Sequence, residues 1–248
     1  MQVDLVLAPC EVVQYDLTHR IAVVIDVFRF TTTVLTALES GVEGFYPVRE
    51  PQEAIAMRDN DPTLLLAGEK HALKIPGFDF GNSPLEHLNR DGRGQRLVCC
   101  TTNGTKTVQA VAEANQVVLA SLRNGLAVAQ YLAAQNQDVL FVPAGTNGRF
   151  SLEDTWCAGL IINELPRAQL GDAAGLARLL ALEVELQTLT QSEHGMRLKR
   201  LEMDEDLAFC LECNVSSSIV LWDPVSGWGK LTKIGSGRKR EIMRGSGM

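Results

Sequence analysis

Three clusters of polar residues in this 248-residue chain share one setting, because each follows a short, β-branched apolar run and precedes a helical pattern. The clusters are residues 26–33, 101–106 and 145–149. In an open parallel α/β sheet, ligands bind in the crevice at the carboxyl ends of the strands. We therefore expect the three clusters to face one pocket. Their side chains are rich in anion donors and include few acids, which suits a phosphate ester.

The first cluster combines an acid, an arginine and three adjacent threonines. Asp26 ends a buried run, where a carboxylate can ligate a hard cation or act as a nucleophile. Arg29 offers a planar fork for phosphate oxygens, and the helix that starts at Thr31 and Thr32 supplies free N–H groups. The alternative is that Asp26 and Arg29 pair with each other while the threonines cap the helix.

The second cluster has the composition of an anion cradle. Glycine allows a positive φ, so that successive N–H groups can converge, and threonine, asparagine and lysine add donors. The spacing is not that of a Walker P-loop, and a plain Asn-Gly turn is the alternative. The third cluster repeats the tripeptide Thr-Asn-Gly after another strand, which favours binding. The anion-binding residues predicted from these two clusters are Thr102, Asn103, Gly104, Thr105, Lys106, Asn147, Gly148 and Arg149.

Two further acids are candidate metal ligands. Glu69 ends the buried run 64–68, as either a salt-bridge partner of a nearby lysine or a metal ligand. Asp154 lies three residues after Ser151, which resembles a capping box, and acids in a first helical turn are favourable for the dipole alone. An acid beside Arg149 can equally hold a metal, so both interpretations of Asp154 stay open.

The segment between Glu69 and the second cluster contains a loop with two aromatic residues among glycines, Gly77–Pro84. It either folds over the pocket as a lid or packs against the sheet edge, which is the plainer interpretation. His71 is the one histidine near a predicted site element. A single loop histidine is more often a surface residue than a catalyst.

Strand-like and helical patterns alternate along the chain with short connections, which predicts an α/β fold with a largely parallel sheet. The expected strands are 3–7, 21–25, 45–48, 64–67, 97–100, 117–120 and 139–142. The expected helices include 31–40, 51–58, 105–114, 125–134 and 152–165. We expect a single domain over residues 1–234, followed by a flexible basic tail at 235–248.

Bulk properties exclude several classes of partner. A net charge of −7 argues against nucleic acid as a partner, because binding its phosphate backbone requires a basic protein surface. No apolar run reaches the roughly 18 residues that span a bilayer, and the start lacks a secretory pattern, so we expect no membrane partner and a cytoplasmic protein. The six cysteines do not form a disulfide pattern and are expected to be reduced. The apolar faces of helices 172–201 fit a homodimer contact or packing within the chain.

With these residues in hand, the chain resembles the 2-phosphosulfolactate phosphatase family. The segments that carry the resemblance are Val24–Thr33, Leu66–Glu69, Gly77–Pro84, Thr101–Thr105 and Ala144–Asp154. The resemblance covers most of residues 3–165 and weakens after about Leu201. It implies a three-layer α/β/α fold and a magnesium-dependent phosphatase. Such an enzyme converts 2-phosphosulfolactate to sulfolactate and phosphate, a step towards coenzyme M.

This reading predicts metal-assisted transfer of a phosphoryl group to water, with Asp26, Arg29, Glu69 and Asp154 as catalytic residues. Asp26, Glu69 and Asp154 are the expected Mg²⁺ ligands. Arg29, Thr31, Thr32 and Asn82 join the two later clusters as residues that bind the small anionic ester.

The sequence leaves alternatives for the attacking nucleophile and for the functional class. Aspartate phosphatases that form an aspartyl-phosphate carry a second Asp two residues on, whereas this chain has Phe28 there. We therefore favour direct attack by a metal-bound water. The alternative class is a non-catalytic sensor or binder of a phosphorylated metabolite. A nucleotide-dependent transferase is disfavoured because no Walker or GxGxxG element is present.

Overall fold

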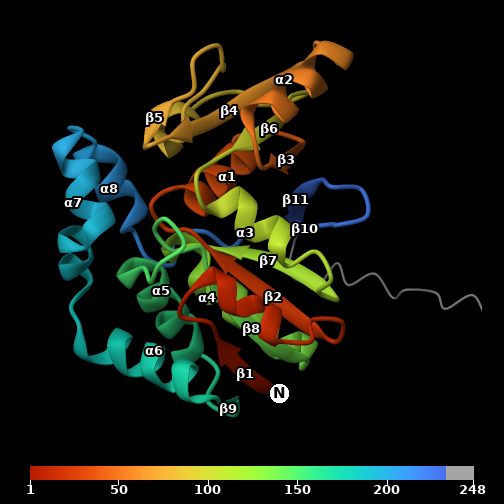
Figure 1. The fold of residues 1–248 in the computed structure, drawn as a ribbon. Coiled ribbons are helices and arrows are strands. Elements are labelled where there is room, and N and C mark those ends of the chain that lie inside the picture. The colour runs from red at the N-terminus through yellow and green to blue at the C-terminus, as the bar shows by residue number, and fades with distance from the viewer. Residues whose placement is uncertain (233–248) are drawn as a thin grey trace, which may run out of the picture.

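A computed structural model of the chain describes residues 1–232, which form one mixed sheet with helices on both faces (Figure 1). The strands are β1 (Gln2–Leu5), β2 (Arg20–Ile25), β3 (Gly44–Val48), β4 (Leu64–Lys70), β5 (Leu73–Lys74), β6 (Arg96–Cys100), β7 (Gln116–Ala120), β8 (Asp138–Pro143), β9 (Gln169–Leu170), β10 (Ile219–Trp222) and β11 (Gly229–Thr232). The α-helices are α1 (Phe30–Glu39), α2 (Pro51–Asn60), α3 (Gly104–Ala110), α4 (Gly125–Gln135), α5 (Leu152–Asn163), α6 (Asp172–Glu183), α7 (Glu193–Arg200) and α8 (Asp204–Cys210). Short 3₁₀ turns lie at Pro9–Gln14, Pro84–Glu86, Leu122–Asn124 and Leu186–Gln191.

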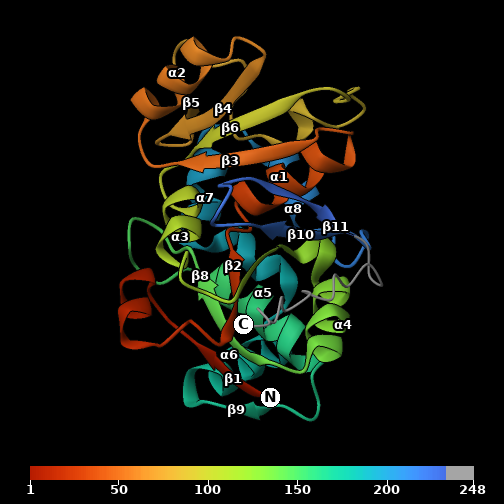
Figure 2. The ribbon, with the colours of Figure 1, turned by 90° about the vertical axis from the view of Figure 1, so that its right-hand side faces the viewer.

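The sheet consists of two parallel groups of strands joined by a hairpin. Its order within the described residues is β5-β4-β6-β3-β11-β10-β7-β2-β8-β1-β9. Strands β4, β6 and β3 pair in parallel, as do β7, β2, β8, β1 and β9. The hairpin β10–β11 is antiparallel to both of its neighbours, and Figure 2 shows it between the two groups. The expectation of a largely parallel α/β sheet is confirmed, but the hairpin was not predicted.

The three-layer arrangement follows from burial on both faces of the strands. In β2, Ile21, Val23 and Ile25 face the core that contains α4 and α5, whereas Ala22 and Val24 face the core that contains α1. Continuous apolar runs of this kind are typical of parallel strands covered on both sides. The three-layer α/β/α fold is therefore confirmed.

Helix α1 brings the two groups of strands together. It contacts β3 and β11 as well as β7. Its core includes Phe45 and Leu97 from one group and Val24 from the other. Three antiparallel pairings in succession make the group of β4, β6 and β3 run opposite to the group of β2 in the sheet. The ends of β2 and β4 nevertheless lie on the same side of the molecule, near α7 and α8 (Figure 1), and the polar clusters meet there.

The loop Gly77–Pro84 packs against the sheet edge, as the plainer interpretation had it. Phe80 bridges to Ala67 of β4, and the Gly68 N–H donates to the Phe80 carbonyl at 3.1 Å. Phe78 is buried in the core beneath α2. A loop held in this way by backbone hydrogen bonds is part of the sheet edge rather than a lid.

The later helices pack partly within the chain. Ala174, Ala177 and Leu198 are buried, whereas Leu176 and Leu182 of α6 are 52% and 59% exposed. A homodimer contact stays a prediction. No helix within residues 1–232 combines the length and apolar character that a bilayer crossing requires. The tail predicted at 235–248 lies outside the described residues.

Candidate active site

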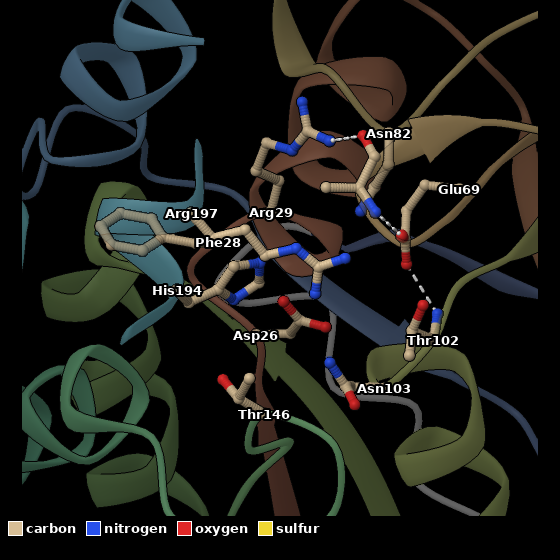
Figure 3. A pocket seen from close by; sticks show the side chains of 11 residues that line it. Asp26, Phe28, Arg29, Glu69, Asn82, Thr102, Asn103, Thr146, His194 and Arg197 are labelled. Carbon is tan, nitrogen blue, oxygen red and sulfur yellow. Dashed lines mark hydrogen bonds between the residues drawn. The ribbon is translucent and has the colours of Figure 1, made fainter. Parts of the chain in front are cut away.

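A pocket of about 360 Å³, partly open to solvent, lies where the strand ends meet (Figure 3). All three polar clusters contribute to its lining, so the predicted convergence is confirmed. The lining residues are Asp26, Phe28, Arg29, Glu69, Ala72, Asn82, Thr102, Asn103, Thr146, His194 and Arg197.

Asp26 follows β2 directly, and the start of α1 fixes its backbone. The Thr31 hydroxyl donates to the Asp26 carbonyl at 2.8 Å and accepts from the Asp26 N–H at 3.1 Å. The Phe30 N–H donates to Asp26 Oδ1 at 3.3 Å. Burial raises the pKa of the Asp26 carboxyl to about 6; nearby His194 opposes this rise, and Glu69 adds to it. Asp26 is thus a buried acid that a neighbouring cation would stabilise in its charged form.

Gly104 allows the first turn of α3 to approach this acid closely. A Cβ at Gly104 would lie 2.5 Å from Asp26 Oδ2 and 2.4 Å from Phe30 Cδ1. Gly104 does not have a positive φ within the described chain, so the sequence argument for a converging N–H cradle is wrong here. The glycine is needed for space rather than for an unusual backbone conformation.

Glu69 ties two strand ends together while lining the pocket. Its Oε1 accepts the Thr102 N–H at 2.7 Å, and its Oε2 accepts the Ala72 N–H at 2.5 Å. The carboxylate thus binds backbone amides that follow β6 and β4. It forms no ion pair with a lysine among the described residues, so that part of the sequence interpretation is not supported.

Arg29 reaches the pocket but its charge is already paired. The guanidinium contacts the Asp206 carboxylate of α8, with side chains only 4% and 6% exposed, and donates to the Ala72 carbonyl at 2.9 Å. The Ser83 hydroxyl also donates to Asp206, at 2.5 Å. The expected alternative of an Asp26–Arg29 pair is wrong, because the partner of Arg29 is Asp206. Arg29 fastens α8 to the turn after β4.

Helix α7 supplies two pocket residues that sequence reasoning missed, His194 and Arg197. Their spacing of three places them on one face of the helix. His194 Nδ1 lies 3.6 Å from Glu153 Oε1, and the Glu153 side chain is 2% exposed. In Figure 3 the Arg197 guanidinium extends over Asp26. The signal in the sequence was a histidine and an arginine one turn apart after a capping serine, Ser192.

Asp154, predicted as a metal ligand, lies outside the pocket lining. Its Oδ1 accepts the Val27 N–H at 2.8 Å, and its Oδ2 accepts the Gly145 N–H at 3.2 Å. Burial raises the pKa of this carboxyl well above its usual value. Asp154 joins the end of β2 to the end of β8, and its own N–H donates to Ser151 at 3.2 Å, which confirms Ser151 as the cap of α5.

Two predicted cations and three predicted threonines also lie outside the lining. Lys106 is 50% exposed and lies 3.7 Å from Glu50, and Arg149 pairs with Glu193 of α7 at 2.9 Å. The hydroxyl groups of the threonines donate to backbone carbonyls four or five residues earlier in the chain. Neither α1 nor α3 has a side-chain cap, so the alternative that the threonines of the first cluster cap the helix is wrong. These threonines are Thr31, Thr32 and Thr105.

The third cluster contributes only Thr146 directly. Asn147 and Gly148 are exposed and have positive φ values of 53° and 75°. The Asn147 N–H donates to Asn103 Oδ1 at 3.1 Å, so this turn supports the pocket residue Asn103 from outside. Asn82 lines the pocket as predicted, whereas His71 is exposed and does not.

The acids of the pocket fit a magnesium ion held mainly by water and substrate. Within residues 1–232 no group of three or more His, Cys, Asp or Glu side chains forms a metal cage. Mg²⁺ usually keeps several waters and takes one or two carboxylates together with phosphate oxygens. Asp26 and Glu69 provide two carboxylates of this kind. Because burial disfavours the charged form of Asp26, a bound cation would stabilise that form.

Comparisons with known proteins agree with the geometry. Residues 6–224 match the family model described as 2-phosphosulpholactate phosphatase. A probable 2-phosphosulfolactate phosphatase of Thermotoga petrophila is 42% identical over 211 residues, which cover 84% of this chain and 89% of the relative. A protein of the same name from Clostridium perfringens is 38% identical over 224 residues, covering 87% and 91%. Another from Symbiobacterium thermophilum is 42% identical over 206 residues, covering 79% and 88%.

Proposed function

The chain belongs to the 2-phosphosulfolactate phosphatase family, and on that premise we propose that it is a Mg²⁺-dependent phosphatase of a small anionic ester. The substrate is 2-phosphosulfolactate, and the products are sulfolactate and inorganic phosphate. The observation that carries the proposal is one pocket in which two carboxylates, Asp26 and Glu69, face hydroxyl, amide and guanidinium donors.

The donors suit a phosphoryl group. Asn103 Oδ1 is occupied by the Asn147 N–H, so its amide nitrogen is the atom left for the pocket, and Figure 3 shows it directed towards Asp26. Thr102 lies beside it, with its backbone N–H held by Glu69. Catalysis of phosphoryl transfer depends mostly on positioning the reactants and on neutralising the charge of the phosphoryl oxygens. Preorganised donors such as these serve both purposes.

Asp26 and Glu69 are the residues that would hold Mg²⁺. When bound, the ion neutralises charge on the phosphoryl oxygens and on the leaving oxygen. Asp154 is left out of the proposed ligand set because its side chain does not line the pocket, whereas that of Glu69 does.

We infer that water, rather than a protein oxygen, attacks phosphorus. A P–O bond to water forms, the P–O ester bond breaks, and the proton lost by water balances the alkoxide that leaves. Phe28, buried beside the pocket, stands where a second aspartate would serve as general acid in an aspartyl-phosphate mechanism. A chase with substrate labelled in the phosphoryl group tests this point. If the label is trapped on the wild-type protein but not on D26N, direct attack by water is contradicted.

The proposal is tested by measuring release of inorganic phosphate from 2-phosphosulfolactate with Mg²⁺, and again after EDTA. We expect release that EDTA abolishes and added Mg²⁺ restores. D26N and E69Q should each lose activity, whereas E43Q, a surface change on the loop before β3, should not. Binding of the ester without any release would instead identify a non-catalytic sensor and contradict the proposal.

A further inference from the structure

The cations near the pocket differ in whether a carboxylate already neutralises them. Arg29 contacts Asp206, Lys106 lies near Glu50, and Arg149 pairs with Glu193. Arg197 lines the pocket and is half-buried, and its guanidinium has no hydrogen bond or ion pair to any residue within the described range 1–232. Of these four cations, Arg197 is therefore the one that lines the pocket without a carboxylate partner.

Contacts at the start of α7 fix the position of Arg197. Ser192 caps the helix by accepting the Gly195 N–H at 3.1 Å. Glu193 pairs with Arg149 at 2.9 Å, and His194 Nδ1 lies 3.6 Å from Glu153. These contacts fasten the first turn of α7 to the segment that follows β8. Helix α8 also packs against α7, so the backbone that carries Arg197 is fixed before a ligand binds, which reduces the ordering that binding requires.

The guanidinium lies on the side of the pocket opposite the second cluster. Figure 3 shows it above Asp26 and facing the space bounded by Glu69, Thr102 and Asn103. No ion pair joins it to Asp26 or Glu69 among the described residues. A group bound between these walls would meet the amide and hydroxyl donors on one side and the guanidinium on the other.

We propose that Arg197 is the arginine that binds the phosphoryl group, a role that the sequence pattern assigned to Arg29 and Arg149. The inference rests on the proposed function and deepens it. An unpaired guanidinium binds two phosphoryl oxygens at once, and this contact strengthens as negative charge redistributes over them during transfer. The charge of Arg29, by contrast, is already neutralised by its buried pair with Asp206.

A direct binding experiment tests Arg197 without requiring turnover. Inorganic phosphate is titrated calorimetrically into the Mg²⁺-loaded wild type, R197M, R197K and R200M. Arg200 lies one turn further along α7, is exposed, and does not line the pocket, so R200M removes the same charge from the same helix. We expect the Kd for phosphate to rise at least about tenfold in R197M, less in R197K, and not in R200M.

Kinetics then decide which group of the substrate Arg197 binds. R197M should lose activity by similar factors on 2-phosphosulfolactate and on p-nitrophenyl phosphate, because both carry the phosphoryl group. Inhibition by inorganic phosphate should weaken, while inhibition by sulfolactate stays as in the wild type. Loss confined to 2-phosphosulfolactate, with weaker inhibition by sulfolactate alone, would overturn the proposal and assign Arg197 to the acid groups.

Two further outcomes separate this inference from the proposed function. If the wild type binds phosphate through Arg197 but releases none from 2-phosphosulfolactate, the proposed function fails and the inference on phosphate binding holds. If the wild type is active and R197M binds phosphate as tightly as the wild type, the inference fails alone. Thermal unfolding of each variant checks the fold, and R197K supplies a charge-conserving change should R197M unfold.

Discussion

The tripeptide Thr-Asn-Gly follows two strands, β6 and β8, and its two copies differ in structure. At residues 102–104 the chain enters helix α3 at Gly104, and both Thr102 and Asn103 line the pocket. At residues 146–148 the chain makes a tight turn, closed by hydrogen bonds between Thr146 and Arg149 at 3.0 and 3.1 Å. In this second copy only the threonine lines the pocket.

The residues that follow each copy explain the difference. Thr105 binds Thr101 through its hydroxyl and its N–H, which starts a helix at once. After the second copy, the helix start is delayed to Ser151, which caps α5. The intervening turn therefore needs positive φ values at Asn147 and Gly148. An identical tripeptide thus forms a binding wall or a supporting turn according to where the next helix begins.

The largest expected difference between the two copies is at their glycines. In G104A the new methyl group would meet Asp26 Oδ2 and Phe30 Cδ1 at 2.5 and 2.4 Å. Displacing these groups should lower kcat/KM by about 100-fold or more. In G148A nothing lies within 4 Å, but φ is +75°, so we expect a loss of about 1 kcal/mol in stability with activity retained. Equal loss of activity in both variants, measured by phosphate release, would contradict the comparison.

The second prediction concerns Asp154, which anchors the supporting turn. D154A removes the acceptor of the Val27 and Gly145 amides, so the free energy of unfolding should fall by about 2–4 kcal/mol in urea titrations. D154N keeps one acceptor oxygen and should lose less. If instead D154A unfolds like the wild type but needs far more Mg²⁺ for activity, Asp154 is a metal ligand after all.

A smaller difference is expected at the asparagines. N103A removes an amide that faces the pocket and should raise KM about tenfold, the effect of one hydrogen bond to a charged group. N147G keeps the backbone N–H that binds Asn103 and relieves a residue with φ of 53°, so its KM should match that of the wild type. A raised KM in N147G would mean that the Asn147 side chain itself contacts the substrate.

The smallest effect on activity is expected beneath the first copy, at His87. Burial, with a smaller contribution from Arg90, lowers the pKa of His87 from 6.5 to about 4. As the pH falls below 6.5, His87 is protonated in the unfolded chain but stays neutral in the folded protein. The free energy of unfolding therefore falls between pH 6.5 and about pH 4, by at most about 3 kcal/mol. H87L should lack this loss in unfolding experiments at pH 7 and pH 4.5, with activity at pH 7 unchanged. If the free energy of unfolding of H87L fell between pH 7 and pH 4.5 as much as that of the wild type, the loss would not come from His87.

Local patterns predicted the fold and the strand-end half of the site. The apolar run of β2 and the cap at Ser151 are local signals, and they correctly indicated where strands and helices begin. From the expected parallel sheet we predicted that Asp26, Glu69, Thr102 and Asn103 converge, and the pocket confirms this. The hairpin makes the group of β4 and β6 antiparallel to the group of β2, so the convergence does not follow from parallel order alone. The position of Asp26 next to a helix start could be predicted because Asp26 and the start of α1 are only a few residues apart in the sequence.

Contacts between distant residues were not predictable in the same way. Arg29 has its partner 177 residues away at Asp206, so no local spacing reveals that its charge is taken. Helix α7 reaches the pocket only through packing that the amphipathic pattern of residues 193–200 does not specify, and His194 and Arg197 were missed. The hairpin β10–β11 likewise depends on pairing with β7 and β3 rather than on its own pattern.

The most direct test of the account is a crystal structure of the protein grown with Mg²⁺ and inorganic phosphate. We expect Mg²⁺ on the carboxylates of Asp26 and Glu69. The phosphate should lie between the Thr102–Asn103 segment and the Arg197 guanidinium, while Arg29 stays on Asp206. Phosphate bound at Lys106 or Arg149, with the pocket empty, would contradict the account.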